Sequence, residues 1–336
     1  MNRRSEAAKK LILALLSACV TLAAVEAGLR ARGYGWQPRI YPNEPTMHEP
    51  DPELGWRSKA GRYVIPAYQD GLPDIRMTFW DDGLRATAPG RTDTKPAVVV
   101  LGGSFTQGWA VSDEDTYAWK LRADFPGTTV LNYGTGAYGT YQSLLALKRH
   151  VLQGRPNPRF VLYGFVQHHE LRNVGDPRWL RFLTLFSRRA HLQVPYCRAG
   201  NGGELDCRPP AGYPMKRLDE RSALISLIRD AWTRRRSASH IAQAEEVTRK
   251  LLAELNRFSR AEGSRLIVVL LNLSAEKGER YAAFFSAAGI DYIDCRVPGM
   301  FRPEFKVPGE GHPNERLHGL WAGCLKKGLA PLLSAT

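Results

Sequence analysis

Residues 96–108, PAVVVLGGSFTQG, constrain the fold more than any other part of this chain. Residues 97–101 are aliphatic and run into two glycines, a pattern typical of a buried parallel strand that ends in a tight turn. Ser104 follows at once, where the next helical segment would begin. Open α/β sheets bind ligands at the carboxyl ends of central strands, where backbone N–H groups can stabilise an oxyanion. Ser104 is therefore a candidate nucleophile, and a glycine turn followed by a helix-capping serine is the structural alternative.

Apolar runs alternate with helical patterns from residue 96 onward, as expected for a doubly wound parallel sheet. The predicted strands cover residues 97–101, 128–132, 159–165, 265–271 and 290–294. The predicted helices cover residues 116–125, 141–152, 241–262, 275–288 and 315–333. Residues 174–239 interrupt the alternation, and long insertions at a strand's carboxyl end often form a lid or a substrate wall.

The N-terminus combines a basic tip with a long uncharged run. The basic residues are Arg3, Arg4, Lys9 and Lys10. Residues 11–25 carry no charge, and counting through residue 29 gives a run long enough to cross a bilayer if Glu26 lies near the interface. Because the basic residues come first, the positive-inside rule places the N-terminus in the cytoplasm and the rest of the chain outside. We predict an uncleaved single-pass anchor, and a cleaved secretory signal is the alternative.

The sequence predicts three parts. Residues 1–32 form the basic tip and the transmembrane anchor. Residues 33–94 are rich in Pro, Gly, Trp and Tyr and are predicted to be a β-rich extension with short strands at 62–68 and 75–80. Residues 95–336 form the main α/β domain, with the insertion at 174–239.

Composition and charge limit the partners. A hydrophobic content of 43% and an aromatic content of 10% indicate a packed core and not a disordered chain. The formal net charge of +14 makes an anionic membrane or an acidic glycan surface a candidate partner. The sequence has no zinc-finger spacing, helix-turn-helix signal or RNA-binding aromatic signature, so we predict no nucleic-acid partner.

Four of the five cysteines lie outside the N-terminal run that holds Cys19. Cys197 and Cys207 flank a glycine-rich polar segment, which is consistent with a disulfide-closed loop in an oxidising compartment. Cys295 and Cys324 can pair if the last strand and the last helix are neighbours. Four unpaired thiols are the alternative, and no cysteine spacing indicates a metal site.

Side chains able to do chemistry gather at five places. These are Gly102-Gly103-Ser104-Phe105, residues 132–137 (NYGTGA), residues 164–173 with His168 and His169, residues 310–314 (EGHPN), and His318 on the following helix. A serine nucleophile needs a base, and the base needs an orienting acid. His312 can be the base for Ser104, and Glu310 can orient it from the same loop. The structural alternative for His312 is a loop histidine before a helix whose N-cap is Asn314. The structural alternative for His168 and His169 is a polar loop. Lys148-Arg149-His150 is interpreted as the solvated side of a helix.

From about residue 96 to the C-terminus, apart from residues 174–239, the chain resembles the SGNH (GDSL-type) hydrolase family. Gly102-Gly103-Ser104-Phe105 is similar to the family's Gly-Asp-Ser block, with Gly103 where aspartate is usual. Glu310 and His312 are similar to the last block, with glutamate in place of aspartate. Residues 54–56, Leu-Gly-Trp, resemble a segment of membrane-anchored bacterial members.

The two middle blocks depart further from the family pattern. Residues 132–137 are similar to the glycine block, and Ala137, next to Gly136, stands where the family has the glycine that donates its N–H. His168 and His169 stand at the Asn-Asp pair of the third block.

The resemblance implies a flavodoxin-like three-layer α/β sandwich with a parallel sheet of about five strands. It implies Ser104 as nucleophile, His312 as base and Glu310 as orienting acid. The oxyanion donors it implies are the N–H groups of Ser104 and Ala137, with Gly136 beside them, and His168.

The resemblance also implies a serine esterase that hydrolyses acyl esters, O-acetyl esters of cell-envelope carbohydrate in particular, with no cofactor and no metal. It implies a bacterial inner-membrane protein with its catalytic domain in the periplasm. Two alternatives remain open: an O-acyltransferase that modifies an envelope polysaccharide, and a non-catalytic glycan-binding protein with the same fold. The missing aspartate at Gly103 and the histidine pair favour the last somewhat.

Overall fold

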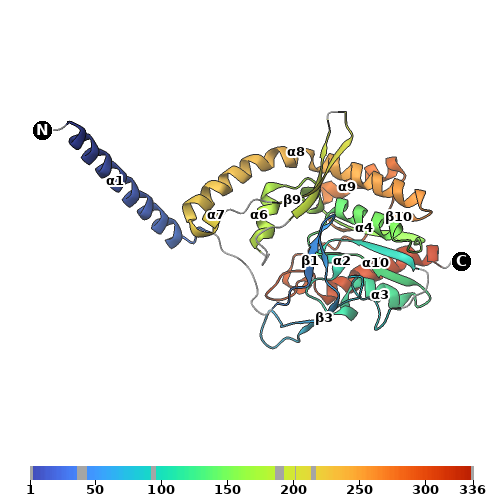
Figure 1. Cartoon of the computed structure of the whole chain (residues 1–336). Helices are drawn as coiled ribbons and strands as arrows, with labels where there is room; N and C mark the ends of the chain where they lie inside the picture. The colour runs from blue at the N-terminus through green and yellow to red at the C-terminus, as the bar shows by residue number, and fades with distance from the viewer. Residues whose placement is uncertain are drawn as a thin grey trace. The chain divides into compact units, whose positions relative to one another are not determined.

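The computed structural model describes residues 3–35, 44–91, 96–185, 193–200, 202–212 and 217–333 (Figure 1). The chain divides into two compact units. One, the helical unit, comprises Met1–Ile40, Pro177–Leu192 and Gly212–Ala238. The other, the sheet unit, comprises Tyr41–Asp176, Gln193–Ala211 and Ser239–Thr336.

The sheet unit is organised around a five-stranded parallel sheet with the order β11-β10-β7-β5-β6. The strands are β5 (Pro96–Gly102), β6 (Thr129–Asn132), β7 (Phe160–Val166), β10 (Arg265–Asn272) and β11 (Asp291–Asp294). Read along the chain, this is the 2-1-3-4-5 order of flavodoxin-like folds. The predicted fold class and the five predicted strands are confirmed.

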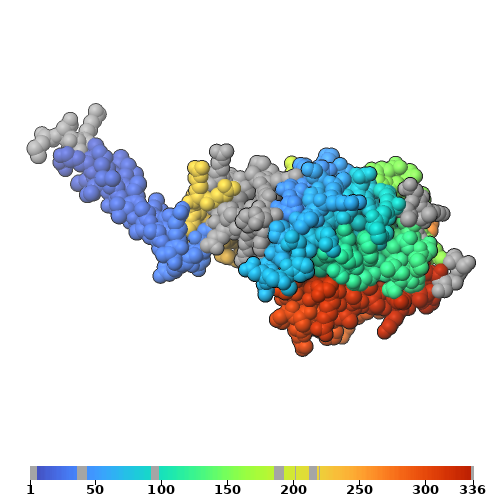
Figure 2. Space-filling model, turned by 90° about the horizontal axis from the view of Figure 1, so that it is seen from below, coloured from blue at the N-terminus to red at the C-terminus, as the bar shows by residue number. Residues whose placement is uncertain are grey.

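Helices cover both faces of the sheet (Figure 1). One face packs on α3 (Tyr117–Asp124) and α10 (Glu315–Leu333), which lie against each other, as the green and red segments of Figure 2 show. The other face packs on α4 (Thr140–Leu152), α9 (Ala275–Ala288) and the later part of α8 (Ala223–Ala261). Successive strand residues point to opposite faces, so Val100 packs with the first group and Leu101 with the second.

The prediction for α8 was wrong at its start. The helix begins at Ala223 and not near residue 241. Its first part belongs to the helical unit and its last part to the sheet unit. The apolar pattern that predicts a helix packed on the sheet therefore covers only the part of α8 that belongs to the sheet unit.

Four short strands form the extension before the sheet. They are β1 (His48–Asp51) and β2 (Gly55–Ser58), paired antiparallel, and β3 (Gly61–Ile65) and β4 (Ile75–Phe79), also paired antiparallel. The strands predicted at residues 62–68 and 75–80 correspond to β3 and β4, and the sequence analysis predicted no strand at β1 or β2. Arg149 of α4 holds this first hairpin, because its guanidinium contacts Asp51 at 2.6 Å and Glu53 at 2.7 Å.

The two disulfides pair the cysteines that the sequence singled out. Cys197–Cys207 joins β8 (Gln193–Ala199) to β9 (Leu205–Gly212). Cys295–Cys324 joins the residue after β11 to α10, which are neighbours as the pairing required. Both pairs close loops inside the sheet unit.

The described part of the helical unit consists of helices. They are α1 (Arg3–Ala31), α6 (Pro177–Leu185), α7 (Arg217–Arg221) and the first part of α8. Within α1, residues Glu6–Ala31 are apolar and long enough to cross a membrane or to serve as a signal sequence.

Candidate active site

Two glycines bring Ser104 to the carboxyl edge of the sheet. Gly102 has a φ of 152°, in the range that side chains disfavour, and a Cβ there would lie 2.3 Å from Thr106 Oγ1. A Cβ on Gly103 would lie 2.7 Å from Arg172 Nη1 and 3.0 Å from His169 Nε2. Ser104 then opens the short helix α2 (Ser104–Gln107). The space that an aspartate at position 103 would need is filled by Arg172 and His169, which explains the departure from the family block.

Ser104, His312 and Glu310 form one chain of hydrogen bonds. His312 Nε2 lies 3.0 Å from Ser104 Oγ, and His312 Nδ1 lies 2.7 Å from Glu310 Oε1. The second carboxylate oxygen of Glu310 accepts the backbone N–H of His312 at 2.7 Å. An ionised Glu310 keeps the proton on Nδ1, so Nε2 is left to accept the proton of the serine.

The loop that carries the acid and the base is held by its own backbone. The carbonyl of His312 accepts from Val307 N at 2.7 Å, and the carbonyl of Val307 accepts from Gly311 N at 2.9 Å. The rings of Phe105 and Trp109 lie 6.0 Å and 6.4 Å from the imidazole of His312. The Glu310 side chain is 9% exposed, against 30% for His312, so the acid is shielded while the base stays open to substrate.

Ala137 has a backbone conformation that usually favours glycine. Its φ is 67°, in the left-handed region that side chains disfavour. Its two neighbours are bound to the extension, because Trp56 Nε1 donates to the Gly136 carbonyl at 3.0 Å and the Tyr138 hydroxyl donates to the Trp56 carbonyl. Gln142 of α4 also donates to the Leu54 carbonyl, at 2.8 Å. The β1–β2 hairpin thus holds the segment around Ala137 in a conformation that costs energy on its own.

The sequence analysis did not recognise Trp56 as part of the site. The Leu-Gly-Trp segment at 54–56 contains Trp56, but the sequence analysis used it only as a resemblance to membrane-anchored bacterial proteins. Gly55 is required there, because a Cβ at that position would lie 2.0 Å from the Gln193 carbonyl oxygen.

The structure separates the two histidines after β7. His168 is exposed, while His169 starts α5 (His169–Asn173), is fully buried, and places Nδ1 2.5 Å from the Tyr163 hydroxyl. Full burial and the charge of Arg172 place the pKa of the His169 imidazole well below its ordinary value. The exposed His168 is desolvated only in part, and this desolvation and the charge of Arg172 lower its pKa as well. Both are therefore neutral near pH 7. In the described part of the chain, no three His, Cys, Asp or Glu side chains are grouped to hold a metal.

His318 lies apart from this arrangement. Its imidazole is fully buried in α10, and Nδ1 accepts the backbone N–H of Tyr117 at 3.2 Å. Burial lowers its pKa to about 3, so it stays neutral and structural.

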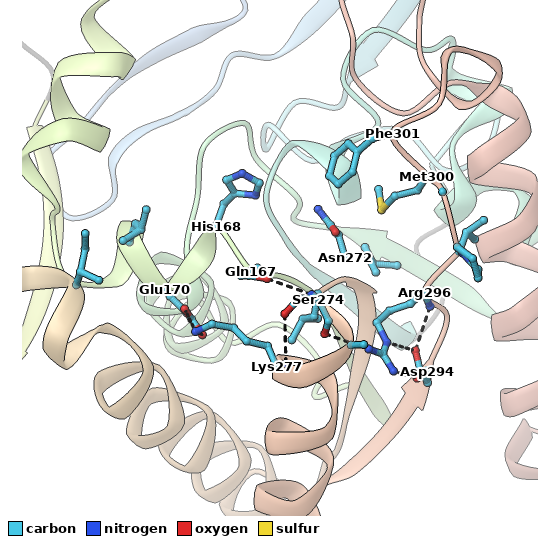
Figure 3. A pocket seen from close by; sticks show the side chains of 18 residues that line it. Gln167, His168, Glu170, Asn272, Ser274, Lys277, Asp294, Arg296, Met300 and Phe301 are labelled. Atoms are coloured by element: carbon cyan, nitrogen blue, oxygen red, sulfur yellow. Dashed lines mark hydrogen bonds and ion pairs between the residues drawn. The ribbon is translucent and has the colours of Figure 1, made fainter.

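A pocket of about 1120 Å³ opens along the carboxyl ends of β7, β10 and β11, and Figure 3 shows its lining. His168 forms part of its wall, and Asn272, Met300 and Phe301, also labelled in Figure 3, line it as well. The charged groups of the lining are paired with one another: Lys277 Nζ lies 2.5 Å from Glu170 Oε2, and Arg296 Nη2 lies 2.6 Å from Asp294 Oδ2. The pocket is thus lined by amide, imidazole and apolar groups, and by two ion pairs whose charges cancel.

No protein-family model matches the chain, and no curated protein matches its sequence. Several solved structures align with about 70% of the chain at low sequence identity. A member of the lipolytic G-D-S-L family from Veillonella parvula is 13% identical, with 68% of this chain and 96% of that chain covered and a TM-score of 0.40. A GDSL-like lipase from Bacteroides thetaiotaomicron is 11% identical, with 73% and 91% covered and a TM-score of 0.38. A catalytic mutant of an acetylxylan esterase from Geobacillus stearothermophilus is 10% identical, with 70% and 95% covered and a TM-score of 0.40.

By its own strand order the chain is a flavodoxin-like α/β protein, and a serine–histidine–glutamate chain of hydrogen bonds lies at the carboxyl edge of its sheet.

Proposed function

We propose that this chain is a serine esterase of SGNH type that hydrolyses acyl esters. The observation that carries the proposal is the chain of contacts from Ser104 Oγ through His312 to Glu310, at 3.0 Å and 2.7 Å. A nucleophile, a base and a buried orienting acid in this order are the groups that acyl transfer requires.

The reaction follows from these atoms. Ser104 Oγ attacks the acyl carbon while His312 Nε2 takes the hydroxyl proton, and Glu310 stabilises the imidazolium that forms. The N–H groups of Ser104 and Ala137, with Gly136 beside them, and the His168 imidazole stabilise the tetrahedral oxyanion. His312 then protonates the leaving alkoxide. Water attacks the acyl-enzyme with His312 again as base, which releases the acid and restores Ser104.

The pocket beside His168 is proposed to hold the alcohol part of the ester. Phe301 is 57% exposed and offers an apolar face to a sugar ring, and the amide of Asn272 offers donor and acceptor atoms to hydroxyl groups. Because the lysine and arginine of the lining are paired with carboxylates, the pocket suits a neutral polyhydroxy substrate. An O-acetyl ester of a cell-envelope carbohydrate has this chemistry.

The proposed setting is the periplasmic side of a bacterial inner membrane, with α1 as an uncleaved anchor and residues 33–94 and 95–336 beyond it. Two disulfides support an oxidising compartment for the sheet unit. The basic residues before the apolar run support a cytoplasmic N-terminus. An anionic membrane or glycan surface remains the proposed partner of the chain's positive charge.

The test is release of acetate from acetylated xylo-oligosaccharides and of nitrophenol from p-nitrophenyl acetate by the full chain in detergent. We expect turnover of both esters, and no turnover by Ser104→Ala above the rate of the buffer. Ser259→Ala, at a buried serine of α8, is the matched control and should keep full activity. Turnover by Ser104→Ala equal to that of the unmodified chain would overturn the proposal.

A further inference from the structure

The helical unit exposes large apolar side chains that the esterase proposal does not use. Leu218 of α7 is 59% exposed, and Ile228 and Trp232 of α8 are 60% and 42% exposed. Ile228 and Trp232 are four residues apart, so they lie on the same side of their helix. We call Leu218, Ile228, Trp232 and the arginines 229, 235 and 236 the α7–α8 surface.

This surface is basic as well as apolar. Residues 217–238 contain six arginines against three acidic residues, and one of the acids, Asp230, is paired with Arg181 of α6. The guanidinium groups of Arg229 and Arg236 lie 5.5 Å and 4.5 Å from the centroid of the Trp232 ring. Tryptophan prefers the headgroup level of a bilayer, and arginine binds phosphate groups there.

A carboxylate joins the end of α1 to the start of α8. Glu26 of α1 accepts hydrogen bonds from Ser222 Oγ at 2.9 Å, Ala223 N at 2.8 Å and Leu224 N at 3.0 Å. These N–H groups belong to the first turn of α8, so Glu26 caps that helix and complements its dipole. Arg30, one turn further along α1, contacts the same carboxylate at 2.7 Å. The charge that interrupts the apolar run therefore has its partners at the start of α8.

We propose that the α7–α8 surface binds the headgroup region of an anionic lipid bilayer, the same bilayer that α1 crosses. The Glu26 contacts place the start of α8 beside the C-terminal end of α1, which is where a spanning helix leaves the hydrocarbon core. An acidic glycan would pair with the arginines but would leave Leu218, Ile228 and Trp232 in water. The inference rests on the proposed anchor and is independent of the esterase chemistry.

The test is hydroxyl-radical footprinting of the full chain in lipid nanodiscs, of phosphatidylcholine alone or mixed with phosphatidylglycerol. We expect oxidation of Leu218, Ile228 and Trp232 to fall several-fold in the discs that contain phosphatidylglycerol. Phe301 and Leu320, exposed residues of the sheet unit, serve as internal controls and should not change. Equal oxidation of the α7–α8 surface in both discs would overturn the proposal, and so would protection that appears only on adding an acidic oligosaccharide.

A charge variant tests the arginines separately. The combined variant Arg229→Gln, Arg235→Gln, Arg236→Gln should lose the dependence on phosphatidylglycerol. A matched variant removes three exposed charges from the sheet unit: Arg62→Gln, Arg76→Gln, Arg257→Gln. It should keep that dependence, and unchanged oxidation of Phe301 reports that both variants are folded. A lost response in both variants would mean that total charge, and not this surface, recognises the lipid.

Discussion

Glu310 stands where the resembled family carries an aspartate, and both of its oxygens are in use. One contacts His312 Nδ1 and the other accepts the backbone N–H of the same residue, each at 2.7 Å. The side chain therefore folds back on the residue two positions later. Both oxygens of the acid are thus bound by the residue that it orients.

Glu310→Gln should lower kcat for p-nitrophenyl acetate by about 10³–10⁴-fold, because an amide no longer stabilises the imidazolium. Glu310→Asp keeps the charge and should lose less. Steady-state kinetics with circular dichroism as a folding control measure both. An activity of Glu310→Gln within a factor of about two of the unmodified chain would show that the carboxylate is not the orienting acid.

Trp56→Phe should lower kcat by about tenfold with little change in KM. The variant keeps an aromatic ring but loses the N–H that holds the Gly136 carbonyl at 3.0 Å, so Ala137 is less firmly held in its left-handed conformation. Tyr138→Phe, which loses the hydroxyl bound to the Trp56 carbonyl, should act in the same direction. A rise in KM at constant kcat would instead assign Trp56 to substrate binding.

His318 should make the fold sensitive to acid. Burial lowers its folded pKa to about 3, against 6.5 as the ordinary value, so the unfolded chain binds the additional proton. Its contribution to stability is present above pH 6.5 and is lost as the pH falls toward 3. Urea unfolding should show a loss of about 1 kcal/mol from this residue between pH 6.5 and 5.5. His318→Gln should flatten the profile, and an unchanged profile would contradict this role.

The site residues that the sequence proposes have signals that are local. Ser104 follows a strand and two glycines, and Glu310 and His312 lie two positions apart, so each pattern is visible within a few residues. Trp56 was not located because its partner Gly136 is distant in the chain and only the fold joins them. His150 shows the same limit: interpreted as part of a solvated face, it is buried and lies 2.6 Å from the Tyr133 hydroxyl.

At the scale of elements, the last disulfide holds the helix that follows the loop of Glu310 and His312. Cys295 lies just after β11 and Cys324 lies in α10, at a sequence separation of 29. A loop of this length contributes about 3–4 kcal/mol through the entropy of the unfolded chain.

Cys295→Ser combined with Cys324→Ser should therefore lower the free energy of unfolding by about 3 kcal/mol. Cys197→Ser combined with Cys207→Ser, which opens a shorter loop of 10 positions, should cost less. Urea titrations of both variants compare the two. Equal losses, or none from the longer loop, would contradict the assignment.

A helix or strand could be predicted where its apolar residues follow one regular pattern and all pack into the core of the same unit. The five strands of the sheet have such patterns, and so do α4 and α9. The first part of α8 packs within the other unit, and β1 and β2 carry mixed polar residues fixed by Arg149, so neither gave a pattern that predicts its structure.

At the scale of the whole molecule, the account predicts an orientation across the membrane. The basic residues lie in the first turns of α1, before its apolar run, and both disulfides lie after α1. Alkaline phosphatase fused to the C-terminus should be active in a bacterial host, and green fluorescent protein fused there through the general export route should stay dark. The opposite pattern would place the sheet unit in the cytoplasm.

The most direct measurement of the central claim is covalent labelling of the full chain by a fluorophosphonate at neutral pH, located by mass spectrometry. The account predicts one modified serine, Ser104, and loss of the label in Ser104→Ala and His312→Ala. Ser259→Ala should label as the unmodified chain does. A folded protein that takes no label, or takes it equally in His312→Ala, would contradict an activated serine and favour a binding role for this fold.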